Sequence, residues 1–506
     1  IEWRETRRIY DSTAVQSHIQ LASSIHGALT NPAIQWFDME WRDQDLRENH
    51  EAQIWIEKAG KAVFDALQDS NFNLEANNAY RSLTSFATAA LMEEPNVDVT
   101  EGWEGINFTS VPIKQVYFEP DDMGQCLNFF RLLSWRPSKI VAKFGIENVP
   151  DKVREAHEKT ASDVPMDVIF CCFTRLDKQN QSERILTPEN RPYGYMYIMR
   201  AQPDQILKEG GYYEMPATIP RWEITDESVW GNGPAHYALG DILTLNHLVE
   251  LDIRSREKVI DPALLIQERA MLNTLDLSPG AQNVCRDPSQ IIPFESAARF
   301  DAVESSIVRL QIAVQKAFYI DQLELKDSPA MTATEVSARM ELMQRLLASP
   351  MARLREDMID PTLQRTFKLM LRAGVLGDMP EAARGAEYDI QYIGPLNRAM
   401  KFDQSASIER WITQLQLIAQ TGGEAEKVLL VPDYDAIARE AARNLNLPTA
   451  LTRSEEDVEA DVERMNQQAA RQASAEAASA EAAAAKDLTQ AESRRGGNQG
   501  IAAVPA

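Results

Sequence analysis

Apolar residues recur every three or four positions in the first part of the chain, a spacing typical of amphipathic helices. The first stripe lies within residues 10–31 and stops at Pro32. The same spacing over residues 46–69 and 75–93 predicts two further helices. The N-terminal part of the chain is therefore predicted to be helical.

From about residue 95 to residue 225 the apolar positions alternate, and Pro, Gly, aromatic and β-branched residues become frequent. Such a pattern favours strands. We expect a hairpin that turns between Glu119 and Gly124, and a short helix over residues 150–162. This segment is predicted to be a β-rich domain.

Helical spacing returns over residues 234–259 and 301–320, on either side of a Pro-bearing segment at about 260–298. The order of helix, compact insertion and helix predicts two neighbouring helices with a small module at one end.

A capping box marks the start of a later helix. The Thr332 hydroxyl can accept a hydrogen bond from the backbone N–H of Glu335, while the Glu335 carboxylate reaches back to the backbone of Thr332. We expect kinks or breaks at Pro350 and Pro361, because proline cannot donate a backbone hydrogen bond inside a helix.

The C-terminal part is predicted to hold one strand over 386–396 and helices over 403–421 and 433–446. Beyond about residue 450 the chain becomes rich in Ala, Glu and Gln and has no apolar stripe, so in isolation it would form at best a marginal helix. Together these elements predict an α+β protein.

Composition narrows the class of protein. With 506 residues, 44% of them hydrophobic, the chain can build several domains. Its 52 Lys and Arg against 76 Asp and Glu give a formal net charge of -24, which excludes a simple basic nucleic-acid wrapper. No apolar run of about 18–20 residues is present, so we expect a soluble protein without a membrane partner.

Motifs for catalysis and cofactors are missing from the sequence. There is no HExxH pair, no P-loop and no G-x-S-x-G elbow, and the four cysteines form no CxxC pair. Gly231-x-Gly233 lacks the third glycine of a dinucleotide loop, which favours a structural turn. We therefore expect no cofactor and no enzyme activity.

Two groups of basic residues have alternative interpretations. Arg254, Arg256 and Lys258 cluster where the first long helix ends, and either interact favourably with that helix terminus or contact nucleic acid. Lys326 lies in the polar segment ELKDSPA, which by itself indicates a surface loop.

Several short motifs, in this order and at compatible spacing, resemble the portal, or head-to-tail connector, proteins of short-tailed bacteriophages. The resemblance covers about residues 8–405. The motifs are DSTA with LASSIHGALTNPAIQWF, SNF at 70–72, SFATAAL at 85–91, RW at 221–222, WGNGPAHYALGDILTLN at 230–246, DPALL at 261–265, SPGA at 278–281, MTATEVSAR and YIGPLNRAMK.

The resemblance implies a non-enzymatic ring, normally of twelve copies, at one vertex of the virion capsid. Double-stranded DNA would pass through its channel during packaging and ejection, without sequence-specific recognition. Implied partners are the terminase that hydrolyses ATP, the major capsid protein, the scaffolding protein and a tail adaptor, with assembly in the host cytoplasm. Two rival interpretations are another ring-forming head-tail component, such as a tail adaptor, and a metal-dependent nuclease.

The resemblance also divides the chain into parts of the portal fold. The expected parts are a wing of helices and a β-rich domain (1–225), stem helices (226–259 and 301–320), an α/β clip (260–300), a tunnel loop (321–331), a long kinked helix with a wing strand (332–402), a helical crown (403–450) and a tail that is a candidate barrel helix (451–506).

Site residues follow from this division. The tunnel loop, with Lys326, Asp327, Ser328 and Pro329, would face DNA, and a ring would turn the single lysine into a belt of positive charge. In the same context, Arg254, Arg256 and Lys258 become candidate channel or adaptor contacts.

Overall fold

The computed structural model describes most of the chain. The described residues are 9–98, 102–122, 124–159, 164–178, 186–225, 228–267, 275–276, 278, 282, 284–285, 287–293, 300–323, 347–392, 407–418, 432–444, 447 and 449–496. They fall into two compact units. The first unit comprises Ile1–Asp38, Ala59–Asp378 and Tyr392–Gly394, and the second comprises Met39–Lys58, Met379–Gln391 and Pro395–Ala506. Helices and antiparallel sheets are both present, as expected for an α+β protein.

The first unit begins with helices whose apolar stripes face one another. They are α2 (Thr13–Leu29), α4 (His50–Asp69), which begins in the second unit, and α5 (Phe72–Phe86). α2 packs against α5, burying Leu21 and Ile25. The helix predicted over 75–93 is wrong at its end, because Ala87 adopts a left-handed backbone conformation with φ 55° and the chain then enters a strand.

Two sheets form the β-rich part of this unit, as the alternating pattern predicted. The three-stranded sheet contains β3 (Gly102–Ser110), β2 (Leu91–Asp98) and β9 (Ala217–Thr218). The five-stranded antiparallel sheet contains, in order, β4 (Val116–Pro120), β5 (Cys126–Trp135), β6 (Met166–Thr174), β7 (Tyr193–Met199) and β8 (Gln202–Tyr212). The predicted turn between β4 and β5 is confirmed, with Gly124 at φ 82°.

Helices α6 (Pro137–Phe144) and α7 (Asp151–Glu158) pack on the five-stranded sheet. Their buried residues, Ile140, Phe144 and Val153, share one core with Phe129 and Phe170 of the strands. The helix predicted over 150–162 corresponds to α7, whereas α6 was not predicted.

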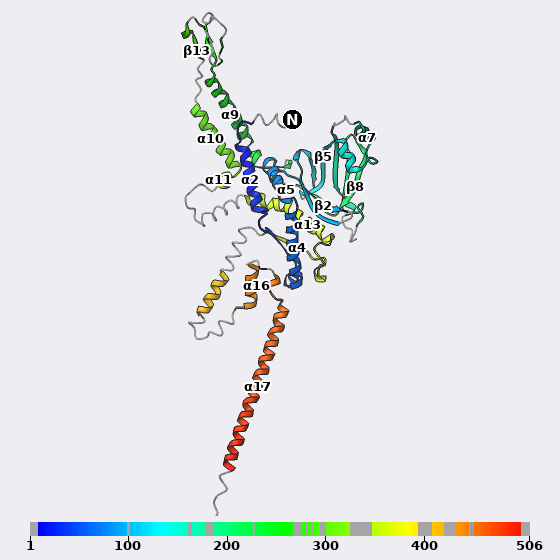
Figure 1. Ribbon diagram of the computed structural model, residues 1–506, viewed down its shortest axis with the longest axis vertical. Coiled ribbons are helices and arrows are strands. Elements are labelled where there is room, and N and C mark those ends of the chain that lie inside the picture. The colour runs from blue at the N-terminus through cyan, green and yellow to red at the C-terminus, as the bar shows by residue number, and fades with distance from the viewer. Residues whose placement is uncertain are drawn as a thin grey trace, which may run out of the picture. The chain divides into compact units, whose positions relative to one another are not determined.

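A pair of long helices continues the first unit. Its elements are β10 (Glu223–Thr225), β11 (Ser228–Asn232), α8 (Pro234–Tyr237), α9 (Leu239–Ile260), β12 (Leu264–Ile266), η3 (Pro288–Gln290), β13 (Ile291–Pro293), α10 (Phe300–Ala317) and α11 (Ile320–Leu323). α9 and α10 lie side by side, and the antiparallel β12–β13 pair lies beyond one end of them (Figure 1). The spacing of apolar residues predicted this order of helix, small module and helix.

The helical segment 347–354 continues through a π-helical turn, η4 (Arg355–Ile359), into α13 (Asp360–Arg372). The backbone N–H of Asp360 donates to the carbonyl of Arg355, a bond that spans five residues instead of four. Pro361 follows at once. In an α-helix its ring would clash with the carbonyl four residues earlier, and the wider turn relieves this clash. The predicted irregularity at Pro361 is confirmed, but the break predicted at Pro350 is not, because the helical segment 347–354 continues through that residue.

The second unit joins three separate segments of the chain. Its elements are the pair β1 (Phe37–Trp41) and β14 (Tyr388–Tyr392), α3 (Gln44–Glu48), η5 (Glu381–Ala383), a helix over 407–418, α16 (Tyr434–Asn444), η6 (Thr449–Leu451) and α17 (Glu455–Gly496). Trp41 anchors this unit by donating from Nε1 to the carbonyl of Ala52 at 2.9 Å. The tail, predicted to be marginal, is one continuous helix of 42 residues (Figure 1). Within the described ranges, no helix has the length and apolar character needed to cross a membrane.

Candidate functional site

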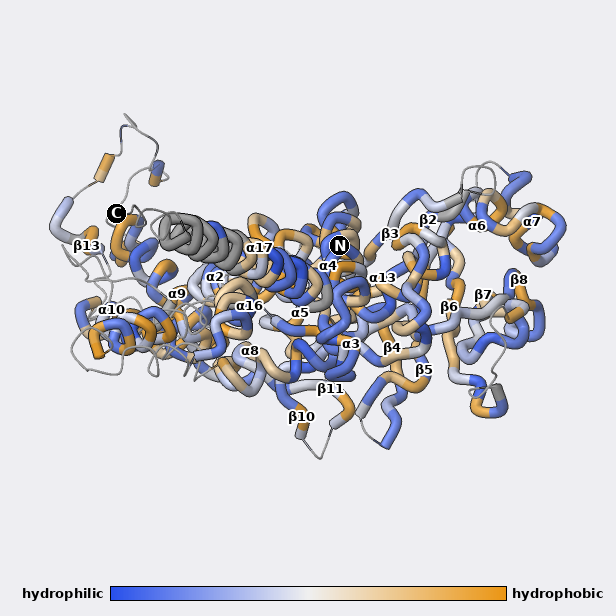
Figure 2. Tube along the Cα trace, turned by 90° about the horizontal axis from the view of Figure 1, so that it is seen from below, coloured by the Kyte–Doolittle hydropathy of each residue, from blue (hydrophilic) through white to orange (hydrophobic). Residues whose placement is uncertain are grey.

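The α9–α10 pair buries little of its own apolar surface. Leu245 is the one buried residue of α9, and Val314 is the one buried residue of α10. Eight large apolar side chains on the two helices are at least 40% exposed, namely Leu239, Leu243, Leu251, Ile253, Val259, Ile260, Val308 and Ile312. Figure 2 shows apolar residues along α9 and α10. Soluble monomers rarely leave such an area uncovered.

The N-terminal segment holds both helices of this pair. The backbone N–H of Tyr10 donates to Oδ1 of Asn246 at 2.7 Å. Asp11 accepts from the backbone of Thr13 at 2.8 Å through Oδ1, and from the Gln311 amide at 2.9 Å through Oδ2. One carboxylate thus links the start of α2 to the middle of α10, which gives the DSTA motif a structural role.

Glycines at the base of α8 permit a close approach of two backbones. A Cβ added to Gly231 would lie 2.2 Å from the carbonyl oxygen of Ala87, and one added to Gly233 would lie 2.9 Å from the Ala87 Cβ. The backbone N–H of Gly231 also donates to Thr88 Oγ1 at 2.9 Å. The Gly-x-Gly sequence therefore serves packing, in agreement with the structural interpretation of these glycines.

Arg221 of the RW motif lies at the same junction. Its guanidinium donates to the carbonyl of Gly124 in the β4–β5 turn and to the carbonyl of Val229 in β11. Burial lowers the pKa of this arginine. The side chain joins the five-stranded sheet to the base of the helix pair.

The three predicted basic residues lie in the last two turns of α9. Arg254 pairs with Glu250 at 2.6 Å, and Arg256 pairs with Asp252 at 2.7 Å. The hydrogen bond to Asp252 raises the pKa of Arg256. In both pairs the acid precedes the base by four residues, which is the favourable order on a helix. Lys258 is exposed and has no charged partner among the residues that the structure describes.

Ion pairing within the helix is thus a third role for Arg254 and Arg256, besides interaction with the helix terminus and contact with nucleic acid. The other predicted site residues, Lys326, Asp327, Ser328, Pro329, Thr332 and Glu335, lie outside the described residues. The tunnel loop and the capping box therefore stay predictions.

A buried carboxyl group that the sequence did not reveal lies between β2 and α13. Glu93 is 3% exposed, and its Oε1 is 3.0 Å from the hydroxyl of Thr366. Its Oε2 is 3.9 Å from Nε of Arg365, which is 4% exposed. Burial raises the pKa of Glu93 to about 8, opposed by the positive charge of Arg365.

Further contacts of Arg365 hold α13 against the strands. Its Nη1 donates to the carbonyl of Glu214 at 2.6 Å, and Arg372 makes two hydrogen bonds of 2.6 Å to the Glu214 carboxylate. Because the Glu214 carboxylate also lies 3.6 Å from Arg365, that arginine has a counter-ion even when Glu93 is protonated.

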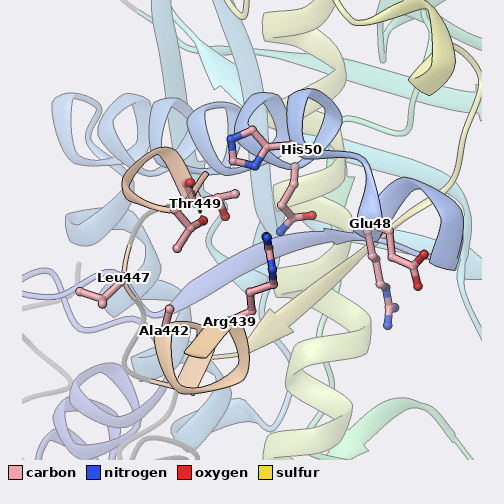
Figure 3. A pocket seen from close by; sticks show the side chains of 9 residues that line it. Glu48, His50, Arg439, Ala442, Leu447 and Thr449 are labelled. Atoms are coloured by element: carbon pink, nitrogen blue, oxygen red, sulfur yellow. Dashed lines mark hydrogen bonds between the residues drawn. The ribbon is translucent and has the colours of Figure 1, made fainter. Parts of the chain in front are cut away.

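A small pocket of about 60 Å³ lies in the second unit (Figure 3). Its lining includes Arg47, His50, Arg439 and Thr449. Arg439 pairs with Asp435 at 2.9 Å, and Thr449 hydrogen-bonds to Glu57 of α4, so these polar groups are used within the unit. The contacts tie the segment after α16 to α4. In the described part of the chain, no three His, Cys, Asp or Glu side chains are grouped to hold a metal ion.

Comparison with known proteins defines the class. The family model described as "Bacteriophage head to tail connecting protein" matches residues 2–452. The chain belongs to this family, which confirms the resemblance found in the sequence. It is a portal, or head-tail connector, protein of phages, with a structural role in the virion.

Two relatives carry a more particular name. The "Probable portal protein" of Bordetella phage BPP-1 is 24% identical over 419 residues, covering 81% of this chain and 74% of the relative. The "Portal protein" of Salmonella phage epsilon15 is 23% identical over 481 residues, covering 93% of this chain and 84% of the relative.

Proposed function

We propose that this protein assembles into a closed ring, normally of twelve copies, at one capsid vertex, and that double-stranded DNA passes through the ring during packaging and ejection. The observation that carries the proposal is the uncovered apolar surface of α9 and α10. Burial of apolar area drives association, at about 25 cal/mol per Å² removed from water. Neighbouring copies would cover these side chains.

In this proposal α9 and α10 are the stem, and the segment between them is the clip that docks the terminase and later the tail adaptor. Residues 1–225 form the wing, which meets the major capsid protein and the scaffolding protein. The crown and α17 would face the capsid interior, and α17 is a candidate helix of a helical barrel.

The charges of the helix pair favour a channel through which DNA moves over a site that binds DNA tightly. Binding to duplex DNA strengthens with each phosphate that a lysine or arginine neutralises. Arg254 and Arg256 are already paired with acids, which leaves Lys258 as the basic contact point on α9, and the proposed Lys326 belt adds another. Such contacts are few and independent of sequence, so DNA can move past them.

The test replaces two exposed apolar residues of the pair, Leu243→Asp and Ile312→Asp, which are 62% and 47% exposed. Both changes place a charge where a neighbouring copy would pack. We expect the wild-type protein to form closed rings in negative-stain images, and the double variant to remain a folded, smaller species by native mass spectrometry.

The control is Leu176→Asp, which introduces the same charge at a 76% exposed apolar residue near the end of β6. It should leave the ring intact. Rings of normal size from the double variant would show that these helices are not the subunit interface. A wild-type protein that stays monomeric at high concentration would refute the ring itself.

A further inference from the structure

Four cations gather on one side of the five-stranded sheet, where α6 meets it. Strand register places Arg131, Phe170, Tyr197 and Lys208 in one row on the same face. α6 adds Lys139 and Lys143 to this row. This basic cluster, consisting of Arg131, Lys139, Lys143 and Lys208, is unusual in a chain with a net charge of -24.

Aromatic rings hold Lys143 in a fixed position. Its ammonium group lies 4.9 Å from the ring centres of both Trp135 and Tyr197, and Nζ is 3.5 Å from the Tyr197 hydroxyl. Lys139 lies 4.6 Å from the Trp135 ring. Contacts with these aromatic rings therefore restrict the positions of the two lysine ammonium groups.

Among the described residues, Glu94 offsets part of the positive charge of the cluster, which carries four cations. No ion pair joins Lys143, Lys208 or Arg131 to an acid within the part of the chain that the structure describes. Glu94 is the nearby carboxylate, and it accepts a hydrogen bond from Tyr212 at 3.1 Å. Partial burial lowers the pKa of Lys143, the negative charge of Glu94 opposes this shift, and the charges of Lys208, Lys139 and Arg131 lower the pKa further. An added anion would relieve this repulsion.

We propose that the basic cluster is a docking site for an acidic peptide segment of a partner protein, whose carboxylates lie between Lys143, Lys208 and Arg131. Lys143 and Lys208 are exposed and can be reached from solvent. This site is independent of the ring and of the DNA channel proposed above.

Nucleic acid fits the cluster less well. The charges converge on one tyrosine, whereas duplex binding needs cations spread along the phosphate backbone. Lys139 and Lys143 already lie against the Trp135 ring, where they would compete with a base for stacking.

The test measures fluorescence anisotropy of a labelled decapeptide that alternates Glu with Gly, added to the assembled full-length protein. We expect saturable binding that weakens with salt and is absent for the same peptide with Gln in place of Glu. The double variant Lys143→Gln, Lys208→Gln should bind at least tenfold more weakly. It keeps the partly buried Arg131, so that the fold is preserved.

The matched control, Lys61→Gln with Lys152→Gln, removes two exposed lysines of the same unit and should bind like the wild type. As a second measurement, bound peptide should protect Lys143 from acylation, read by mass spectrometry. Equal affinities of the double variant and the control would overturn the proposal. It would also be overturned if the assembled protein fails to bind the peptide, or if a DNA duplex binds the cluster more tightly than the peptide.

Discussion

Glu93 offers a sharp test of how α13 is held, because a single atom change distinguishes two charge states. Glu93→Gln keeps the shape of the side chain and can still accept a hydrogen bond from Thr366, but it cannot ionise. If Glu93 is protonated in the folded protein, as its raised pKa indicates, the neutral glutamine should be tolerated at mildly acidic pH.

The magnitude follows from proton linkage. Between the ordinary pKa of 4.5 and the folded value of about 8, the unfolded chain releases the Glu93 proton more readily than the folded protein does. The free energy of unfolding therefore falls as pH rises, by up to about 1.4 kcal/mol for each pH unit. The variant lacks this loss, so its stability relative to the wild type should increase steadily from pH 5 to pH 8.

Chemical denaturation of the purified full-length proteins, followed by tryptophan fluorescence at several pH values, measures this difference. Glu209→Gln, an exposed change on β8, is the control and should give no slope. The reasoning is refuted if Glu93→Gln lowers the free energy of unfolding by about 3–5 kcal/mol at every pH. Such a loss would show that Arg365 depends on an ionised Glu93 and is left as an uncompensated buried charge without it.

Other predictions concern the helix pair and the predicted loop. Gly231→Ala should lower the free energy of unfolding by about 1–3 kcal/mol, because the new Cβ meets the Ala87 carbonyl. Gly240→Ala, in open space on α9, should raise it by about 0.5–1 kcal/mol. Thermal unfolding measures both changes, and equal effects would contradict the packing argument. Asp11→Ala removes the bonds to α2 and α10 and should cost about 0.5–2 kcal/mol, whereas unchanged stability would remove its linking role. Lys326→Ala should reduce DNA packaging while rings still form, and packaging at the wild-type level would argue against a tunnel-loop contact.

Local patterns predicted the elements better than their ends. The spacing of apolar residues located α2, α9 and α10, because each helix carries its apolar residues on one face. The end of α5 was not predictable, because Ala87 takes its left-handed conformation where the distant Gly231 packs against it. The pattern also missed α6, a short helix that begins at Pro137 and whose apolar residues pack on β5, β6 and β7.

Among the charged residues, too, local contacts could be predicted from the sequence and long-range contacts could not. The i, i+4 spacing of Glu250 and Arg254 is visible in the sequence, so their pairing could have been predicted from that spacing. The buried contact of Glu93 with Arg365 could not, because the two residues are 272 positions apart. The basic cluster was also hidden, since strand register and helix packing bring its members together from three elements.

The π-helical turn before α13 makes the number of residues in this helix depend on the proline at position 361. A π turn contains one residue more than an α turn, so it marks a point where the helix can gain or lose a residue without disturbing its ends. A one-residue deletion within Arg355–Ile359 would keep both flanking segments in their present orientation, but it would bring the ring of Pro361 against a carbonyl. Such a deletion therefore requires a change at Pro361. The same deletion inside α13 would instead rotate everything beyond it by about 100°.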